Sequence, residues 1–222
     1  MPEPLITITD PLSPISEAFR TLRTNLEFSS LDKPIRTMLV TSAGPEEGKS
    51  TTLANLAVTI AQGGKKVILV DCDLRRPVLH QIFGVSNGVG LTTMMVDEEA
   101  MKNPPLQETD LPNLWLLPSG PLPPNPSELL GSHRMEEIIE VLLARSDMVL
   151  FDAPPVIAVT DAAVLASKVD GVLLVIKAGG TRRDHVQRAK DRLEKVNARL
   201  VGAVLNNVPL EVGLHRYYSK RA

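Results

Sequence analysis

The chain has 222 residues, of which 43% are hydrophobic and 23% charged, and its formal net charge is −2. This balance fits a globular protein with a sizeable core and argues against a general nucleic-acid-binding protein. The single cysteine, Cys72, excludes an internal disulfide and favours a reducing compartment. No apolar run is long enough to cross a bilayer, and the N-terminus lacks the pattern of a signal peptide. We therefore expect a cytoplasmic protein that reaches a membrane only through a partner.

The chain begins with a proline-rich segment, residues 1–12, that is predicted to form an extended arm. Ser13 followed by Pro14 then indicates the N-terminus of a helix, because serine caps helices and proline suits their first position. Apolar residues recur at helical spacing after it: Ile15, Ala18, Phe19, Leu22 and Leu26. We expect this helix to bury one face.

Another face of the same helix carries Glu17, Arg20 and Arg23, which lie three residues apart. Spacing alone favours a solvated face with local ion pairs, each of which stabilises a helix by a few tenths of a kcal/mol.

Residues 37–51 contain the most informative pattern in the chain. An apolar run is followed by small residues, by Gly48-Lys49-Ser50, and by a helical run that ends near Gln62. In such a loop the backbone N–H groups and the helix N-terminus point at one anion, and the glycine lets the backbone approach it closely. Lys49 can reach the β- and γ-phosphates of a nucleotide, and the Ser50 hydroxyl can ligate Mg²⁺.

The pattern predicts a phosphate-binding loop, with an ordinary strand–turn–helix connection as the alternative. Ala43 stands where the usual pattern opens with glycine. The expected nucleotide-binding residues of the loop are Gly44, Pro45, Glu46, Glu47, Gly48, Lys49, Ser50 and Thr51.

A second apolar run, residues 65–71, is predicted to be a core strand that ends in Asp71-Cys72-Asp73. Ligands bind at the carboxyl ends of strands in open parallel sheets. Two carboxylates at such an end suit a metal ion and a hydroxyl group to be activated. The alternative is that they cap the next short helix.

The middle of the chain, residues 84–130, is rich in proline and has little periodicity, so we expect much of it to be ordered loop. A short helix is predicted at 91–96 and a short strand at 113–117. Helical sequence then begins at Ser127 and continues over 135–143.

A third core strand, from Asp147, ends in Asp152. Four apolar residues followed by aspartate are typical of a carboxylate that holds the Mg²⁺ shell, and a strand-terminal turn is the alternative. Further strands are predicted at 171–177 and 200–205, separated by a charged helix over 182–196. Asn206 ends the last strand, where its amide could contact a purine base or form an Asx turn.

Alternating strands and helices predict an α/β fold with a mostly parallel sheet flanked by helices. We expect one domain over residues 13–212 and a mobile polar tail over 213–222.

Taken together, these motifs resemble those of the bacterial tyrosine kinases that act with capsule and exopolysaccharide assembly systems. The resemblance runs over nearly the whole length and implies a P-loop NTPase fold of the partition-ATPase-like class with deviant Walker motifs. Partition and septum-site ATPases carry an extra lysine near the start of the loop, where this chain has Ser42-Ala43-Gly44. The motifs that carry the resemblance are 42–51 as phosphate loop, 68–75 as the second Walker A-type motif, 148–154 as Walker B, the Glu-x-x-Arg-x-x-Arg motif at 17–23, and 117–120 with 123–130.

Members of this family form rings, and the resemblance implies that Glu17, Arg20 and Arg23 contact a neighbouring subunit. It also implies that tail tyrosines are phosphorylated between subunits. This chain has only Tyr217 and Tyr218 there, fewer than is usual in the family. The expected partners are other copies of the chain and a transmembrane polysaccharide co-polymerase or adaptor that recruits it to the inner face of the membrane.

The expected reaction is transfer of the γ-phosphoryl group of ATP to a tyrosine hydroxyl. Lys49 and the loop amides would hold the phosphates, and Ser50, Asp73 and Asp152 would organise the Mg²⁺ shell. Asp71 would accept the phenol proton or orient the incoming oxygen. The alternatives are a non-kinase ATPase switch and a catalytically reduced, nucleotide-binding assembly subunit.

Overall fold

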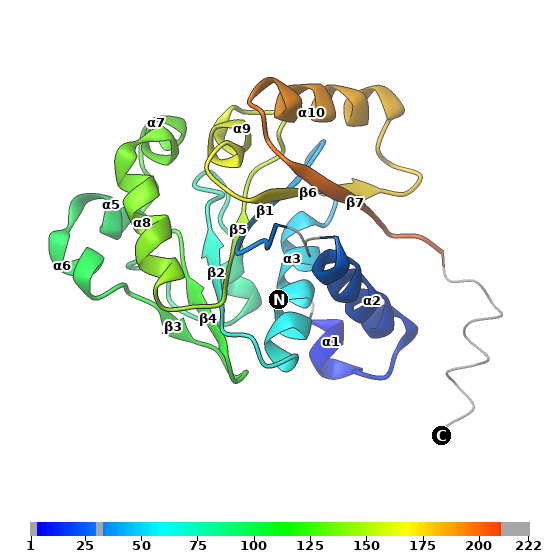
Figure 1. The fold of residues 1–222 in the computed structure, drawn as a ribbon, viewed down its shortest axis with the longest axis horizontal. Coiled ribbons are helices and arrows are strands. Elements are labelled where there is room, and N and C mark those ends of the chain that lie inside the picture. The colour runs from blue at the N-terminus through cyan, green and yellow to red at the C-terminus, as the bar shows by residue number, and fades with distance from the viewer. Residues whose placement is uncertain (1–3, 30–32, 210–222) are drawn as a thin grey trace.

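The computed structural model describes residues 4–29 and 33–209 and shows one sheet with helices on both faces (Figure 1). Within this part of the chain the sheet has seven strands in the order β3-β4-β2-β5-β1-β6-β7. All neighbouring pairs are parallel except β3 with β4. The strands are β1 (Thr37–Ser42), β2 (Val67–Asp71), β3 (Gln107–Glu108), β4 (Leu114–Leu117), β5 (Met148–Asp152), β6 (Gly171–Lys177) and β7 (Leu200–Asn206).

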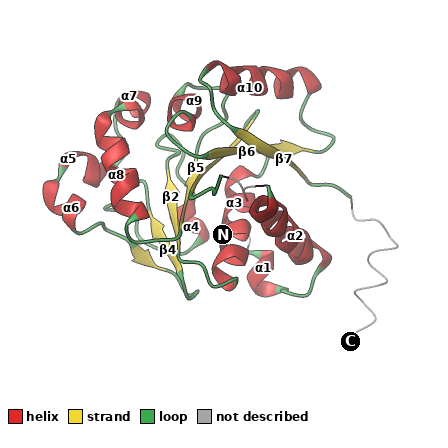
Figure 2. Ribbon diagram, viewed as in Figure 1, coloured by secondary structure: helices red, strands yellow, loops and turns green. Residues whose placement is uncertain are grey.

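The helices of the described residues fall into two layers (Figure 2). They are α1 (Ile6–Thr9), α2 (Pro14–Phe28), α3 (Lys49–Gln62), α4 (Leu79–Ile82), α5 (Leu91–Val96), α6 (Glu98–Lys102), α7 (Pro126–Gly131), α8 (His133–Leu143), α9 (Asp161–Ala166) and α10 (Arg183–Lys195). One apolar core lies between the sheet and the layer that contains α1–α4, and the other lies between the sheet and the layer that contains α5 and α7–α10.

The central strands β1, β2 and β5 are buried at every residue. Strands covered on both faces need continuous apolar runs, because neither face meets water. Their sequences, with polar residues gathered at the carboxyl ends, satisfy this requirement. The predicted α/β class and mostly parallel sheet are confirmed, and α5 and β6 have the predicted bounds.

The N-terminal segment differs from the predicted extended arm, because residues 6–9 form the one-turn helix α1. The prolines of this segment lie outside that turn and do not oppose it. Thr7 is buried, and both its amide and its hydroxyl donate to Asn55 Oδ1 of α3, at 3.1 and 2.8 Å. Leu5 packs into the core beside α3. This segment is therefore folded by contacts with residues distant in sequence, and its proline content gives no indication of those contacts.

The predicted cap of α2 is confirmed, since Ser13 accepts a hydrogen bond from the Ser16 amide and Pro14 occupies the first turn. The sequence predicts no bounds for the short elements α4, α6, α9 and β3. Each has at most six residues, which is too short for a periodic pattern to be detected.

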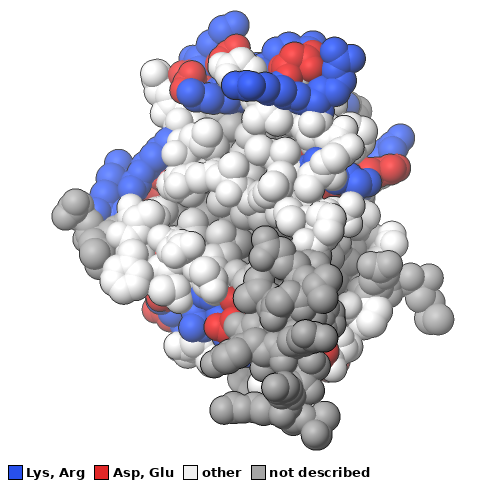
Figure 3. Space-filling model, turned by 90° about the vertical axis from the view of Figure 1, so that its right-hand side faces the viewer, with Lys and Arg blue, Asp and Glu red and all other residues white. Residues whose placement is uncertain are grey.

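The predicted charged helix is α10, and its side chains gather along the upper edge of the face in Figure 3. Both signs are interspersed there, with Arg182 and Arg188 each paired to Asp184. Within the described residues, no helix combines the length and the apolar character needed to span a membrane. The tail 213–222, with Tyr217 and Tyr218, lies outside the described residues.

Candidate nucleotide site

Three neighbouring strands deliver the predicted site residues to one edge of the sheet. The phosphate loop follows β1, Asp71 ends β2 and Asp152 ends β5. The sheet register places Asp71 beside Asp152 and Val40 beside Asp152. Since β1, β5 and β2 are adjacent and parallel, motifs separated by about a hundred residues meet at their carboxyl ends.

The loop itself owes its shape to Gly48, the N-cap of α3. Its φ of 84° is in the left-handed region, which favours glycine. A Cβ at Gly48 would lie 2.1 Å from Asn206 Nδ2, so no larger residue fits. Asn206 donates that amide to the Glu47 carbonyl at 3.0 Å. The last residue of β7 therefore holds the phosphate loop from the side opposite β5.

Glu47, predicted to bind the nucleotide, turns its side chain inward. Its carboxylate accepts hydrogen bonds from the Ala43 amide at 3.1 Å and from the Thr181 hydroxyl at 2.7 Å. The loop backbone is also braced by the Ser42 hydroxyl, which donates to the Gly44 carbonyl. The side chain of Glu47 thus supports the loop, whose backbone remains available for an anion.

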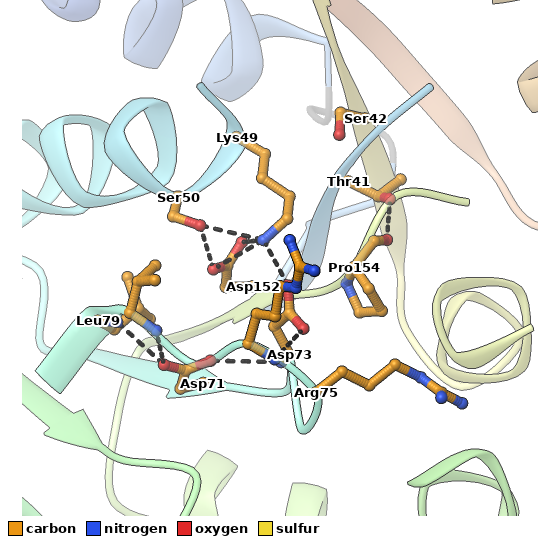
Figure 4. Close-up of polar contacts among 12 residues, drawn as sticks. Thr41, Ser42, Lys49, Ser50, Asp71, Asp73, Arg75, Leu79, Asp152 and Pro154 are labelled. Carbon is orange, nitrogen blue, oxygen red and sulfur yellow. Dashed lines mark hydrogen bonds and ion pairs between the residues drawn. The ribbon is translucent and has the colours of Figure 1, made fainter. Parts of the chain in front are cut away.

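Lys49 lies among three of the predicted side chains (Figure 4). Its Nζ is 3.0 Å from Asp73 Oδ2, 3.2 Å from both carboxylate oxygens of Asp152 and 3.0 Å from Ser50 Oγ. The Ser50 hydroxyl donates to Asp152 in turn. Residues predicted from separate motifs are thus brought into direct contact.

Burial and charge oppose each other in this cluster. Burial alone would lower the pKa of Lys49, but the charges of Asp152 and Asp73 outweigh it and hold that pKa above its ordinary value. For Asp152, burial raises the pKa in spite of Lys49 and the Ser50 hydroxyl. The negative charge of the carboxylates in this cluster therefore exceeds the positive charge of Lys49. Such an excess favours binding of a cation at the cluster.

Asp71 is fully buried, and its carboxylate oxygens reach toward Leu79 and Asp73 (Figure 4). It accepts hydrogen bonds from the amides of Val78 and Leu79, at 3.1 and 3.0 Å, and from Asp73 at 3.3 Å. The helix-capping alternative is thus present in the structure. Burial, followed by the charge of Asp152, raises the pKa of Asp71 to about 8.

The predicted Mg²⁺ ligands fit an ion that completes its shell with phosphates and water. Among the residues that the structure describes, no group of three His, Cys, Asp or Glu side chains could hold a metal by itself. Ser50, Asp73 and Asp152 supply one hydroxyl and two carboxylates around Lys49. Magnesium is usually bound in this way, by one or two carboxylates together with substrate phosphates.

A pocket of about 410 Å³ opens at this edge. Its lining includes residues 45–51 and Asp73, together with Leu5, Val78 and Ile82. The sequence does not predict the last three, because Leu5 is distant in sequence and the other two lie in or beside a one-turn helix. The spacing of four residues between Val78 and Ile82 is the one sequence signal that could have indicated them. A single such spacing is too short a pattern to identify a helix face.

Arg75 does not join the phosphate site. Its guanidinium makes two contacts with Asp161, at 2.8 and 3.1 Å, and Figure 4 shows it pointing away from Lys49. Asp161 is fully buried. The pair therefore ties the loop after β2 to the start of α9.

The predicted interface residues make contacts within the chain. Arg20 pairs with Glu17 at 2.7 Å and donates to the Pro11 carbonyl. Arg23 donates to the Thr59 carbonyl of α3 at 2.7 Å. The local ion pair expected from spacing is present for Glu17 and Arg20, whereas Arg23 links two helices.

Comparison with known proteins identifies the family. Residues 38–220 match the family described as the CobQ/CobB/MinD/ParA nucleotide binding domain. Tyrosine-protein kinase YwqD of Bacillus subtilis is 46% identical over 206 residues, which cover 93% of this chain and 86% of that protein. Putative tyrosine-protein kinase CapB of Staphylococcus aureus is 40% identical, with coverage of 97% and 94%.

A solved structure, the chimerical protein CapA2B2, superposes with a TM-score of 0.87 at 38% identity and covers 93% of this chain and 90% of that chain. The family match spans the phosphate loop, Asp71, Asp73, Asp152 and Asn206. The chain therefore belongs to the CobQ/CobB/MinD/ParA nucleotide-binding family and, within it, to the bacterial tyrosine-protein kinases.

Proposed function

We propose that this protein transfers the γ-phosphoryl group of ATP to tyrosine hydroxyls, with Tyr217 and Tyr218 of a neighbouring copy as acceptors. The observation that carries the proposal is the position of Lys49, within 3.2 Å of Asp73, Asp152 and Ser50 at the carboxyl ends of β1, β2 and β5. This arrangement supplies a phosphate-binding cation beside carboxylates and a hydroxyl that suit Mg²⁺. Kinship with named tyrosine-protein kinases supports tyrosine as the acceptor.

In this proposal the backbone amides of residues 44–51 and the Lys49 ammonium hold the phosphates. Ser50, Asp73 and Asp152 would hold Mg²⁺, which would neutralise charge on the phosphates. The amide of Asn206, which lies next to Gly48, is the proposed contact to the base. Positioning and charge neutralisation supply most of the acceleration, because phosphoryl transfer needs little covalent help.

The tyrosine oxygen forms a bond to the γ-phosphorus, the bond from that phosphorus to the β–γ bridging oxygen breaks, and ADP leaves. The phenol proton passes to a carboxylate. Asp71 is the proposed acceptor in its ionised form. Its pKa is raised to about 8, so it is a stronger base than an ordinary aspartate once it has lost its own proton, which a cation bound beside it would promote. Its contacts with the amides of Val78 and Leu79 must loosen for it to act.

We further propose that the protein assembles into a ring of copies through Glu17, Arg20 and Arg23. A transmembrane polysaccharide co-polymerase or adaptor would recruit this cytoplasmic ring to the inner face of the membrane. There it would regulate synthesis and export of a capsular polysaccharide or exopolysaccharide. The names of relatives support the kinase activity, and the family resemblance supports the pathway.

The deciding experiment incubates the purified protein with ATP and Mg²⁺ and measures phosphotyrosine beside free phosphate. We expect phosphotyrosine on the chain, lost in Lys49→Met. Free phosphate without phosphotyrosine would instead identify a non-kinase ATPase switch. Nucleotide binding with neither product would identify an assembly subunit.

A further inference from the structure

The two carboxylates proposed to hold Mg²⁺ belong to different parts of the chain. Asp73 lies in the loop that joins β2 to α4, and Asp152 is followed by the loop that joins β5 to α9. Lys49 contacts both carboxylates, at 3.0 and 3.2 Å, but in the proposed function its ammonium also binds the phosphates. Other groups are therefore needed to keep the two carboxylates at a fixed separation.

The loop after β5 is attached to the neighbouring strand β1. Its Pro154 carbonyl accepts a hydrogen bond from the Thr41 hydroxyl at 2.7 Å. Its Val156 amide donates to the Ser42 carbonyl at 2.9 Å. Because β1 leads directly into the phosphate loop, these contacts fix the loop after β5 relative to the bound phosphates.

The loop after β2 takes its shape from hydrogen bonds within its own segment. Asp71 accepts from the amides of Val78 and Leu79, and Asp73 accepts from the Arg76 amide at 3.0 Å. These contacts fold the loop, but they do not connect it to the loop after β5.

Arg75 makes that connection. Its guanidinium donates twice to Asp161, at 2.8 and 3.1 Å, and Asp161 is the first residue of α9. Asp161 is fully buried, and in the described part of the chain no other protein group donates to its carboxylate. The Cys72 amide donates to the Asp152 carbonyl at 2.9 Å, so the two loops are also joined where they begin. Asp73 lies between these two connections.

We propose that the Arg75–Asp161 ion pair positions Asp73 relative to Asp152 and thereby sets the affinity of the site for its divalent cation. This inference rests on the metal site of the proposed function. A guanidinium that donates twice to one carboxylate fixes direction as well as distance. Mg²⁺ demands near-octahedral geometry at short distances, so a small change in the separation of two ligands weakens its binding. Arg75 and Asp161 are thus positioning residues that act through Asp73.

The test measures binding of Mn²⁺, detected by electron paramagnetic resonance, to the full chain loaded with a non-hydrolysable ATP analogue. Asp161→Asn removes the buried charge at nearly constant volume and leaves the half-exposed Arg75 free to turn to solvent. Arg75→Gln combined with Asp161→Asn removes the pair without leaving a buried charge, and it decides the question if the single variant fails to fold. Arg188→Gln is the matched control, because it breaks an exposed pair with Asp184 on α10.

We expect the dissociation constant for Mn²⁺ to rise about tenfold in Asp161→Asn and in the double variant, as is usual for residues that support metal ligands. The affinity for the ATP analogue in EDTA should stay close to that of the Arg188→Gln control, because Lys49 and the loop amides are unchanged. In phosphotyrosine assays the Mg²⁺ concentration for half-maximal rate should rise by the same factor. The rate at saturating Mg²⁺ should approach that of the control.

Equal Mn²⁺ affinity in Asp161→Asn and Arg188→Gln, with only a lower melting temperature, would overturn the positioning role and leave the kinase proposal standing. A loss of nucleotide affinity in EDTA that matches the loss of metal affinity would also overturn it, because the whole site would then have loosened. No Mn²⁺ binding by the loaded wild type would overturn the proposed metal site and this inference together. Free phosphate without phosphotyrosine from the wild type would overturn the kinase proposal, whereas a tenfold weaker Mn²⁺ site in Asp161→Asn would still support the positioning role.

Discussion

Lys49 joins two buried carboxylates that would otherwise repel each other. Its Nζ contacts Asp73 and Asp152, and Asp71 lies beside Asp152 in the sheet register. Breaking a buried ion pair by removing one partner costs about 3–5 kcal/mol, because the remaining charge keeps its desolvation penalty. The side chain proposed to bind phosphate thus also stabilises the nucleotide-free fold.

Lys49→Met should abolish phosphotransfer and lower the melting temperature of the nucleotide-free protein at pH 8. The decrease should be smaller at pH 6, because carboxyl groups left without a cation take up protons. Phosphotyrosine assays and thermal melts followed by circular dichroism measure both effects, with Lys49→Arg as the control that keeps the charge. Unchanged phosphorylation in Lys49→Met would contradict the assignment.

The raised pKa of Asp71 gives a second prediction at this scale. Burial and the charge of Asp152 raise that pKa to about 8, whereas an aspartate in the unfolded chain titrates near 3.9. Between these values the folded protein holds a proton that the unfolded chain lacks. The resulting stability is therefore present below pH 4 and is lost as pH rises toward 8.

Asp71→Asn, which stays neutral and keeps an oxygen for the amides of Val78 and Leu79, should flatten the fall in stability between pH 5 and pH 8. Urea unfolding of nucleotide-free protein in EDTA measures the two slopes. Parallel slopes for the variant and the wild type would show that Asp71 is already ionised in the folded protein.

Some site residues could be predicted from sequence and others could not, for a physical reason. Lys49, Ser50, Asp73 and Asp152 follow apolar strands, and parallel strands bring their carboxyl ends together whatever the loops do. The direction in which a side chain points could not be predicted in this way. Glu47 turns inward to Thr181, and Asp71 turns to the amides of 78–79, because of partners that no local pattern reveals.

At the scale of elements, the long helices and central strands followed from periodicity, whereas the short ones depended on tertiary contacts. The helix α1 forms because Thr7 meets Asn55 and Leu5 meets the core, neither of which is near in sequence. In α2 the cap and the apolar face were both predictable. The function of its charged face was not, since Arg23 reaches α3 and Arg20 stays on its own segment.

Because Arg23 and Arg20 have different partners, their substitutions should have different effects. Arg23→Ala leaves the Thr59 carbonyl without its charged donor and should cost about 1–2 kcal/mol of monomer stability. Arg20→Ala removes a partly exposed pair with Glu17, which is worth at most about 1 kcal/mol. If the α2 face joins subunits, Arg20→Ala should lower the oligomer mass in light scattering and leave the melting temperature of dilute protein nearly unchanged. A wild-type mass for Arg20→Ala would mean that its face is only solvated.

At the scale of the whole molecule, different strands contact the phosphate loop along one edge of the sheet. The carboxyl end of β7 meets the phosphate loop on one side, and those of β5 and β2 meet it on the other. The pocket at this edge is lined by the loop, by Asp73 and by Val78 and Ile82. An acceptor tyrosine must reach this pocket, whichever chain supplies it.

Transfer between copies predicts a specific result when an inactive chain is mixed with an active chain that lacks the acceptor tyrosines. One chain carries Lys49→Met and keeps its tyrosines, and the other is active but carries Tyr217→Phe and Tyr218→Phe. If a ring tethers each tail near a neighbouring site, its effective concentration there reaches the millimolar range, and the Lys49→Met chain should become labelled. Phosphotyrosine is detected after the chains are separated by a size tag.

Label on the Lys49→Met chain should fall on dilution below the dissociation constant of the oligomer, whereas transfer within one chain does not depend on concentration. A wild type that labels itself while the mixture stays unlabelled would restrict transfer to a single chain.

Each phosphate adds about −1.5 to −2 charges, so a labelled tail should be repelled from a site that already holds Asp73, Asp152 and phosphates. We therefore expect the labelled oligomer to have a lower mass in light scattering than the unlabelled one at the same concentration.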